Sequence, residues 1–160
     1  MRMKNRVLAL AVVACATFGS SVYATDSKVI PGTACQPIQA DLVTGITRRG
    51  TFFNQQGENI GIDCPIVRDN NATSSGAVSA QVRVNGRGQK VSCILSSYDR
   101  SGAVLDSDTG ESTATFPDTI VLSISNGVSR GAYSISCDLP DQGELINYTV
   151  TELTPTDDNN

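Results

Sequence analysis

Apolar and polar residues alternate with a period of two along most of this chain, and no segment shows a helical repeat. Such alternation predicts strands that bury one face. The clearest apolar sets are Val78, Ala80, Val82 and Val84; Val91, Cys93 and Leu95; Ile120, Leu122 and Ile124; and Tyr133, Ile135, Cys137 and Leu139. Further strands are expected at Phe52-Phe53, over Ile60, Ile62, Cys64 and Ile66, and over Ile146, Tyr148 and Val150.

Turn-forming residues separate these segments. Asn85-Gly86-Arg87-Gly88-Gln89 predicts a hairpin, because its glycines suit positions of positive φ. Asp99–Gly102, Ser125–Gly127 and Asp138–Gly143 are also expected turns, and Asp69–Gly76 is expected to be an exposed loop. About seven to nine strands separated by such turns predict an all-β fold, a two-sheet antiparallel β-sandwich. The immunoglobulin-like and jelly-roll-like versions both stay open, although the chain lacks the tryptophan typical of immunoglobulin cores.

The N-terminus has the pattern of an export leader. Arg2, Lys4 and Arg6 precede a short apolar run, and Ser21–Ala24 offers small residues for cleavage before Thr25. We therefore expect a signal peptide over 1–24, one sandwich domain over 25–153 and a disordered polar tail over 154–160. The apolar run is too short to span a membrane. A lipobox-like stretch ending at Cys15 leaves a lipoprotein anchored there as a second interpretation.

Four cysteines follow this leader, at positions 35, 64, 93 and 137. No two form a CxxC pair, so structural disulfides in a periplasmic or extracellular protein are the preferred interpretation. Three connectivities are possible. We favour Cys93–Cys137, because both residues lie mid-strand on an apolar face, and Cys35–Cys64, as a clip for the N-terminal segment.

The composition and charge of the chain argue against several classes of function. The formal net charge is −4 and histidine is absent. An acidic chain with few aromatics is a poor partner for nucleic acid or an anionic membrane. The commonest catalytic base is missing, and no GxSxG or HExxH motif occurs. We expect a protein that is not an enzyme and needs no cofactor. A small hydrolase with an unrecognised carboxylate pair among the sixteen acids is one alternative.

Asp106, Asp108 and Glu111 are the candidate metal ligands. Carboxylates at alternate positions before a glycine can converge on Ca²⁺, although the spacing does not fit an EF-hand. An acidic, solvated hairpin loop is the preferred interpretation of this segment. The first alternative function is a Ca²⁺-assisted carbohydrate-binding module, which would use this loop together with Arg87.

Candidate ligand-binding residues are Arg83, Arg87 and Lys90, which surround the Asn85-Gly86 turn, together with Tyr98. Arginine can grip a carboxylate or sulfate with two hydrogen bonds. Basic residues at a strand edge also simply prevent aggregation, and that interpretation is favoured. Tyr98 lies beside a turn and could stack on a sugar, whereas Tyr133 and Tyr148 share faces with aliphatic residues and should be buried.

Each of the four cysteines lies in a short motif, and a fifth motif closes the domain. They are Ala34-Cys35-Gln36-Pro37, Cys64–Asp69, Cys93-Ile94-Leu95, Cys137–Pro140 and Tyr148–Glu152. This ACQP…CPxxRD…CxL…CxLP frame resembles a family of small exported bacterial proteins. The resemblance implies a bacterial, exported origin and assigns no activity to any residue. The sequence therefore predicts a non-catalytic binding or structural module of the cell envelope, with an extracellular protein or a glycan as its ligand.

Overall fold

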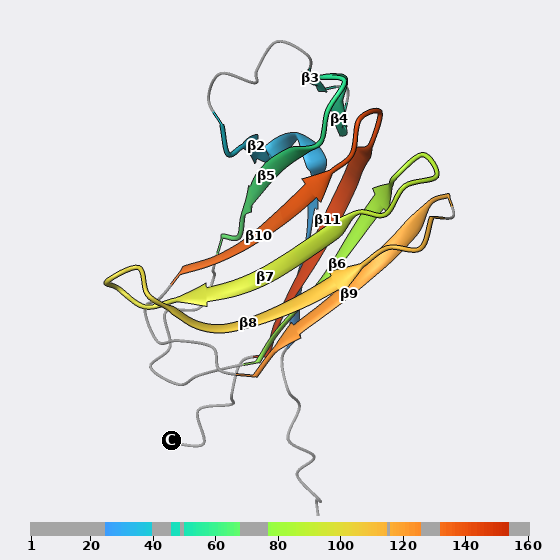
Figure 1. Cartoon of the computed structure of the whole chain (residues 1–160). Helices are drawn as coiled ribbons and strands as arrows, with labels where there is room; N and C mark the ends of the chain where they lie inside the picture. The colour runs from blue at the N-terminus through green and yellow to red at the C-terminus, as the bar shows by residue number, and fades with distance from the viewer. Residues whose placement is uncertain are drawn as a thin grey trace, which may run out of the picture.

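The computed structural model describes residues 25–39, 46–48, 50–67, 77–114, 116–125 and 132–153. Two antiparallel sheets face each other (Figure 1). The six-stranded sheet contains β1 (Thr25–Pro31), β3 (Ile46–Arg48), β4 (Phe52–Asn54), β6 (Val78–Asn85), β9 (Asp118–Ile124) and β11 (Glu144–Leu153). The five-stranded sheet contains β2 (Gln36–Pro37), β5 (Ile60–Pro65), β7 (Ser92–Tyr98), β8 (Val104–Glu111) and β10 (Ala132–Leu139). A 3-10 turn, η1 (Gly32–Ala34), joins β1 to β2.

The predicted sandwich is confirmed, and its topology is that of a jelly roll. The strands from β4 to β11 pair as β4 with β11, β5 with β10, β6 with β9, and β7 with β8. This is the pattern of a long hairpin folded over on itself, with successive arms placed in opposite sheets. Of the two architectures left open by the sequence, the jelly roll is therefore correct. The described strands also outnumber the expected ones, because β1, β2, β3 and β8 have no clear alternation of apolar residues.

The turn between β6 and β7 corrects one prediction. β6 and β7 belong to different sheets, so Asn85–Gln89 carries the chain across the sandwich and is not a β-hairpin. One of the two glycines has the positive φ that the sequence predicts: Gly88 has a φ of 88°. Arg87 also has a positive φ, of 52°. Gly86 is required for a different reason, since a Cβ there would lie 1.8 Å from the carbonyl oxygen of Gln89.

The core lies between the two sheets. Its residues include the inward sets of β6, β7, β9 and β10 that the alternation predicts, together with Phe52, Ile60 and Ile62. Strand β11 departs from the prediction, because its register shifts between Leu145 and Asn147. A β-bulge there puts an extra residue on one side of the ladder. Leu145, Tyr148 and Val150 are consequently buried, and Ile146 does not share their face.

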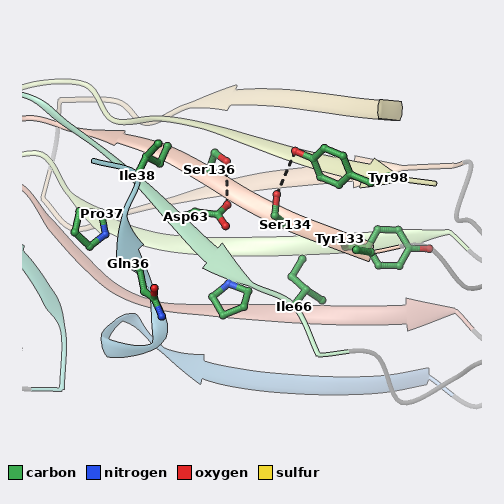
Figure 2. Close-up of a pocket in the computed structure, with 11 residues that line it drawn as sticks. Gln36, Pro37, Ile38, Asp63, Ile66, Tyr98, Tyr133, Ser134 and Ser136 are labelled. Carbon is green, nitrogen blue, oxygen red and sulfur yellow. Dashed lines mark hydrogen bonds between the residues drawn. The ribbon is translucent and has the colours of Figure 1, made fainter. Parts of the chain in front are cut away.

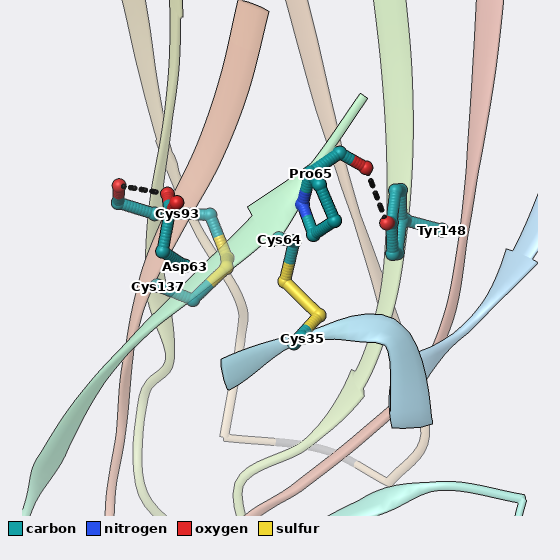
Figure 3. The surroundings of a disulfide bond; sticks show 8 residues. Cys35, Asp63, Cys64, Pro65, Cys93, Cys137 and Tyr148 are labelled. Atoms are coloured by element: carbon teal, nitrogen blue, oxygen red, sulfur yellow. Dashed lines mark hydrogen bonds between the residues drawn. A yellow bond between two sulfur atoms is a disulfide. The ribbon is translucent and has the colours of Figure 1, made fainter. Parts of the chain in front are cut away.

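Two disulfides join the pairs that the sequence favours (Figure 3). Cys93 and Cys137 are directly opposite each other on the neighbouring strands β7 and β10, so this bond staples one sheet. Cys35 follows η1 and bonds Cys64 of β5, which fastens the N-terminal segment to the body. All four cysteines are at most 2% exposed, which leaves no accessible thiol among them.

Several expectations fall outside the described residues: the leader 1–24 with Cys15, the loop Asp69–Gly76, the Asn126-Gly127 turn and the tail 154–160. In the part of the chain that the structure describes, no helix is long and apolar enough to cross a membrane.

Candidate functional site

An open trough runs along β10 on the outer face of the five-stranded sheet. The core-facing residues of β10 alternate with Ala132, Ser134, Ser136 and Asp138, which point outward. Three of these four outward side chains are very small. A central strand with such small side chains lies lower than its neighbours, and it forms the floor of the trough.

Larger side chains on the neighbouring strands form the two walls. Tyr98 and Ile94 of β7 stand on one side, and Asp63 of β5 stands on the other. The register aligns Ile94, Ser136 and Asp63 in one row across the sheet. The second wall is extended by Gln36, Pro37, Ile38, Pro65 and Ile66.

The main depression encloses about 840 Å³ and is open to solvent (Figure 2). A shallower depression continues it toward Ser92 and Asp138, sharing Ile38 and Ser136 with the main one. Because a strand rises about 3.3 Å per residue, the outward residues of β10 span roughly 20 Å. The trough therefore suits an extended chain better than a compact ligand.

Hydrogen bonds hold the polar side chains of the trough in place. Ser136 Oγ donates to Asp63 Oδ1 at 3.2 Å, and Ser134 Oγ donates to Tyr98 Oη at 3.4 Å (Figure 2). Both bonds run from the floor to a wall. They fix the carboxylate of Asp63 and the ring of Tyr98 on opposite sides of the same channel.

Backbone contacts position the wall that β2 and β5 form. Ile38 N donates to the carbonyl oxygen of Gly61 at 2.9 Å, and the Ile38 side chain covers this glycine. A Cβ on Gly61 would lie 3.1 Å from Ile38 Cδ1, so a larger residue would push Ile38 off the wall. The glycine thus allows an exposed isoleucine to sit close above the sheet.

Tyr148 supports the same wall from inside the sandwich. Its hydroxyl donates to the carbonyl oxygen of Pro65 at 2.7 Å (Figure 3). Burial, and secondarily the negative charge of Asp63, raise the pKa of Tyr148 to about 12. The hydroxyl therefore stays protonated and keeps donating to Pro65 far above neutral pH.

The structure places the candidate residues of the sequence analysis in different surroundings. Tyr98 is half-buried and lines the trough, whereas Tyr133 and Tyr148 are buried as expected. Arg87 lies over the exposed ring of Phe116, 5.8 Å from its centroid. Arg83 is exposed on β6, in the other sheet.

Lys90 and Glu111 form an ion pair. Lys90 Nζ lies 2.9 Å from Glu111 Oε2, and this carboxylate raises the pKa of Lys90. Lys90, a candidate ligand-binding residue, and Glu111, a candidate metal ligand, are thus paired with each other.

The acidic segment Asp106–Glu111 is part of strand β8, which corrects the expectation of a hairpin loop. Asp108 Oδ2 accepts from Ser123 N at 2.7 Å, and Asp106 Oδ2 accepts from Ser125 N at 3.2 Å. These two carboxylates therefore bind backbone N–H groups at the edge of the opposite sheet, where β8 and β9 run side by side (Figure 1). In the part of the chain that the structure describes, no three acidic or cysteine side chains gather as a metal site.

Sequence reasoning missed most of the trough. Ser134, Ser136 and Asp63 lie between the apolar residues of their strands and were not among the candidate site residues. The available signal was the small size of every second residue in Ala132–Ser136, on a strand whose other residues are large and apolar.

Comparison with known proteins adds little. No family model matches the chain, and no curated protein matches it significantly. Among solved structures, the Podospora anserina GH26-CBM35 β-(1,4)-mannanase aligns at 14% identity and TM-score 0.46, over 82% of this chain and 29% of that one. The C-terminal CBM6 of LamC, a laminarinase from Zobellia galactanivorans, aligns at 12% and 0.42, over 79% and 99%. A CBM6 from Cellvibrio mixtus lichenase 5A, in complex with cellotriose, aligns at 14% and 0.42, over 79% and 98%. These TM-scores are too low to carry a functional argument for this chain.

Proposed function

We propose that this protein is a non-catalytic module that binds a glycan chain along the trough over β10. The observation that carries the proposal is the trough itself: an open channel whose walls hold an aromatic ring and a carboxylate, and whose floor includes the hydroxyl groups of Ser134 and Ser136. The two disulfides support a location in an oxidising compartment outside the cytosol.

The chemistry of the trough matches that of a sugar chain. A sugar ring has an apolar face, which stacks on aromatic side chains, and an edge of hydroxyl groups, which exchange hydrogen bonds. Tyr98 offers the ring, and Ile38 offers an exposed apolar surface on the opposite wall. Ser134, Ser136 and Asp63 offer hydrogen-bonding groups between them.

Binding is favoured over hydrolysis by the surroundings of the carboxylates. Among the residues that the structure describes, Asp63 and Asp138 are the acids that line the trough, and both are exposed. A glycosidase needs one carboxyl group in an apolar pocket that keeps it protonated, so that it can act as the general acid. Neither of these aspartates has such a pocket.

The proposal needs no calcium. Asp106 and Asp108 are committed to the backbone of the β9 edge, and Glu111 is paired with Lys90. We therefore expect glycan binding to survive chelation by EDTA.

Tyr98→Ala tests the proposal. Loss of a stacking ring should weaken binding by about 1 kcal/mol or more, which is about fivefold or more in the dissociation constant. Isothermal titration against a panel of oligosaccharides and pull-down on insoluble polysaccharides would measure it. Phe116→Ala is the matched control, because it removes an exposed ring outside the trough.

A second variant blocks the channel without removing a stacking group. Ser136→Tyr places a large side chain on the floor, and an aromatic residue on the solvent face of a strand is well tolerated. Binding should be lost while the melting temperature stays close to that of the wild type. Wild-type protein that binds no glycan in the panel would refute the proposed function.

A further inference from the structure

The trough carries charge of one sign. In the regions that the structure describes, Asp63 and Asp138 are the charged side chains that line it, and no lysine or arginine does so. The basic residues of the described surface are elsewhere, with Lys90 paired to Glu111 and Arg87 over Phe116. The described lining of the channel is therefore negatively charged.

The two aspartates of the trough differ from the others in how they are bonded. One oxygen of Asp63 accepts from Ser136, and its Oδ2 has no hydrogen-bond donor within the described structure. The carboxylate of Asp138 has no hydrogen bond to any described residue; its Oδ1 lies 3.9 Å from where a Cβ of Gly61 would be. Every aspartate outside the trough whose side chain is described accepts a hydrogen bond that secures a turn, a loop or a strand edge: Asp99, Asp106, Asp108, Asp118 and Asp141.

An oriented carboxylate with an unused oxygen favours a cationic group. Ser136 holds Asp63 above the floor, so that a ligand in the channel meets the carboxylate edge. An ammonium group placed there would form a charge-assisted hydrogen bond. A uronic acid at the same place would meet like charge and be repelled.

We propose that the ligand of the trough is an amino-sugar chain with free amino groups, and that Asp63 is the residue that selects it. This inference rests on the glycan-binding function proposed above. The ammonium group of one ring pairs with Asp63 Oδ2, while Tyr98 and Ile38 contact ring faces along the channel. Asp138 lies one row further along the trough and can pair with a second ammonium group.

The test compares matched hexasaccharides by isothermal titration: β-1,4-linked glucosamine, its fully N-acetylated form, cellohexaose and a hexagalacturonate. We expect the amine to bind most tightly, the two neutral chains less tightly and the uronate least. Exposed ion pairs are modest, so Asp63→Asn should lower affinity for the amine about two- to fivefold and leave the neutral chains unchanged. The preference for the amine should also weaken at high salt.

Glu58→Gln is the matched control, because it removes one exposed negative charge outside the trough. Equal binding of the amine and the neutral chains by the wild type would overturn this inference and leave glycan binding intact. If Glu58→Gln lowered the affinity for the amine as much as Asp63→Asn does, only the net charge of the protein would matter. That result would overturn the role of Asp63. Hexalysine is included as a further probe: if it binds as tightly as the amine, the ligand class is a cationic peptide and the inference is wrong. Absence of binding to every saccharide would refute the proposed function itself.

Discussion

Asn54 should be one of the most sensitive positions for stability in the described structure. It is fully buried at the end of β4, and its Nδ2 lies 2.8 Å, 3.0 Å and 2.9 Å from the carbonyl oxygens of Glu58, Leu139 and Pro140. Its Oδ1 accepts from Gln56 N at 3.0 Å. One side chain thus ties the loop after β4 to the turn that joins β10 to β11.

Asn54→Ala removes all of these bonds at once. The carbonyl oxygen of Leu139 loses this donor in a buried site, at about 1–2 kcal/mol, whereas that of Pro140 still accepts from Gly143 N and loses only about 0.5–1 kcal/mol. The N–H of Gln56 loses its acceptor, which adds about 0.5–1 kcal/mol. The free energy of unfolding should therefore fall by about 2–4 kcal/mol, a large part of the total for a small domain.

Equilibrium unfolding in urea, with both disulfides oxidised, measures this change. Asn59→Ala is the control, because Asn59 is exposed in the same loop and should change stability by less than about 0.5 kcal/mol. If Asn54→Ala lowered stability by no more than the control, Asn54 would not be the tie between the two turns that the geometry indicates.

Two further predictions follow from side chains that bond to distant backbone. Because the folded pKa of Tyr148 is raised above its unfolded value of about 10, its contribution to stability is complete below pH 10 and is lost as the pH rises toward 12. In Tyr148→Phe, stability should be lower at neutral pH by about 1 kcal/mol, and the alkaline loss measured by urea unfolding should be smaller; an unchanged alkaline slope would contradict the assignment. Asp108→Ala should expose the Ser123 N–H at the β9 edge and promote self-association, seen by light scattering, since open strand edges pair with other chains. Asp108→Asn keeps an oxygen acceptor and should stay monomeric like the wild type; identical behaviour of the two variants would argue against edge protection.

The core was predictable from the sequence because burial follows local alternation. Val82, Leu122 and Ile135 were each assigned inward from their own strand, and all are buried. The Cys93–Cys137 bond was predictable for the same reason, because the strand pattern placed both cysteines on inward faces, and Cys35–Cys64 was the pair that remained, favoured as a clip for the N-terminal segment.

The pairing of strands was less predictable, because it depends on partners far away in the sequence. The turn at Asn85–Gln89 has the same residues whether the chain returns in one sheet or crosses to the other. The bulge at Leu145 is imposed by the ladder with β6. Asp106–Glu111 has little strand propensity and forms a strand because β7 pairs with it. The trough depends on three strands lying side by side, so no single segment could reveal it.

The Cys35–Cys64 bond has a consequence for when the trough becomes complete. Cys64 lies between Asp63 and Pro65, and Cys35 directly precedes Gln36. One covalent bond therefore joins the two strands of the same wall, and β2 has only two residues of ladder to hold it otherwise. A newly made, reduced chain would have the floor of the trough before it had a firm wall. Completion of the trough is thus coupled to oxidation of Cys35 and Cys64.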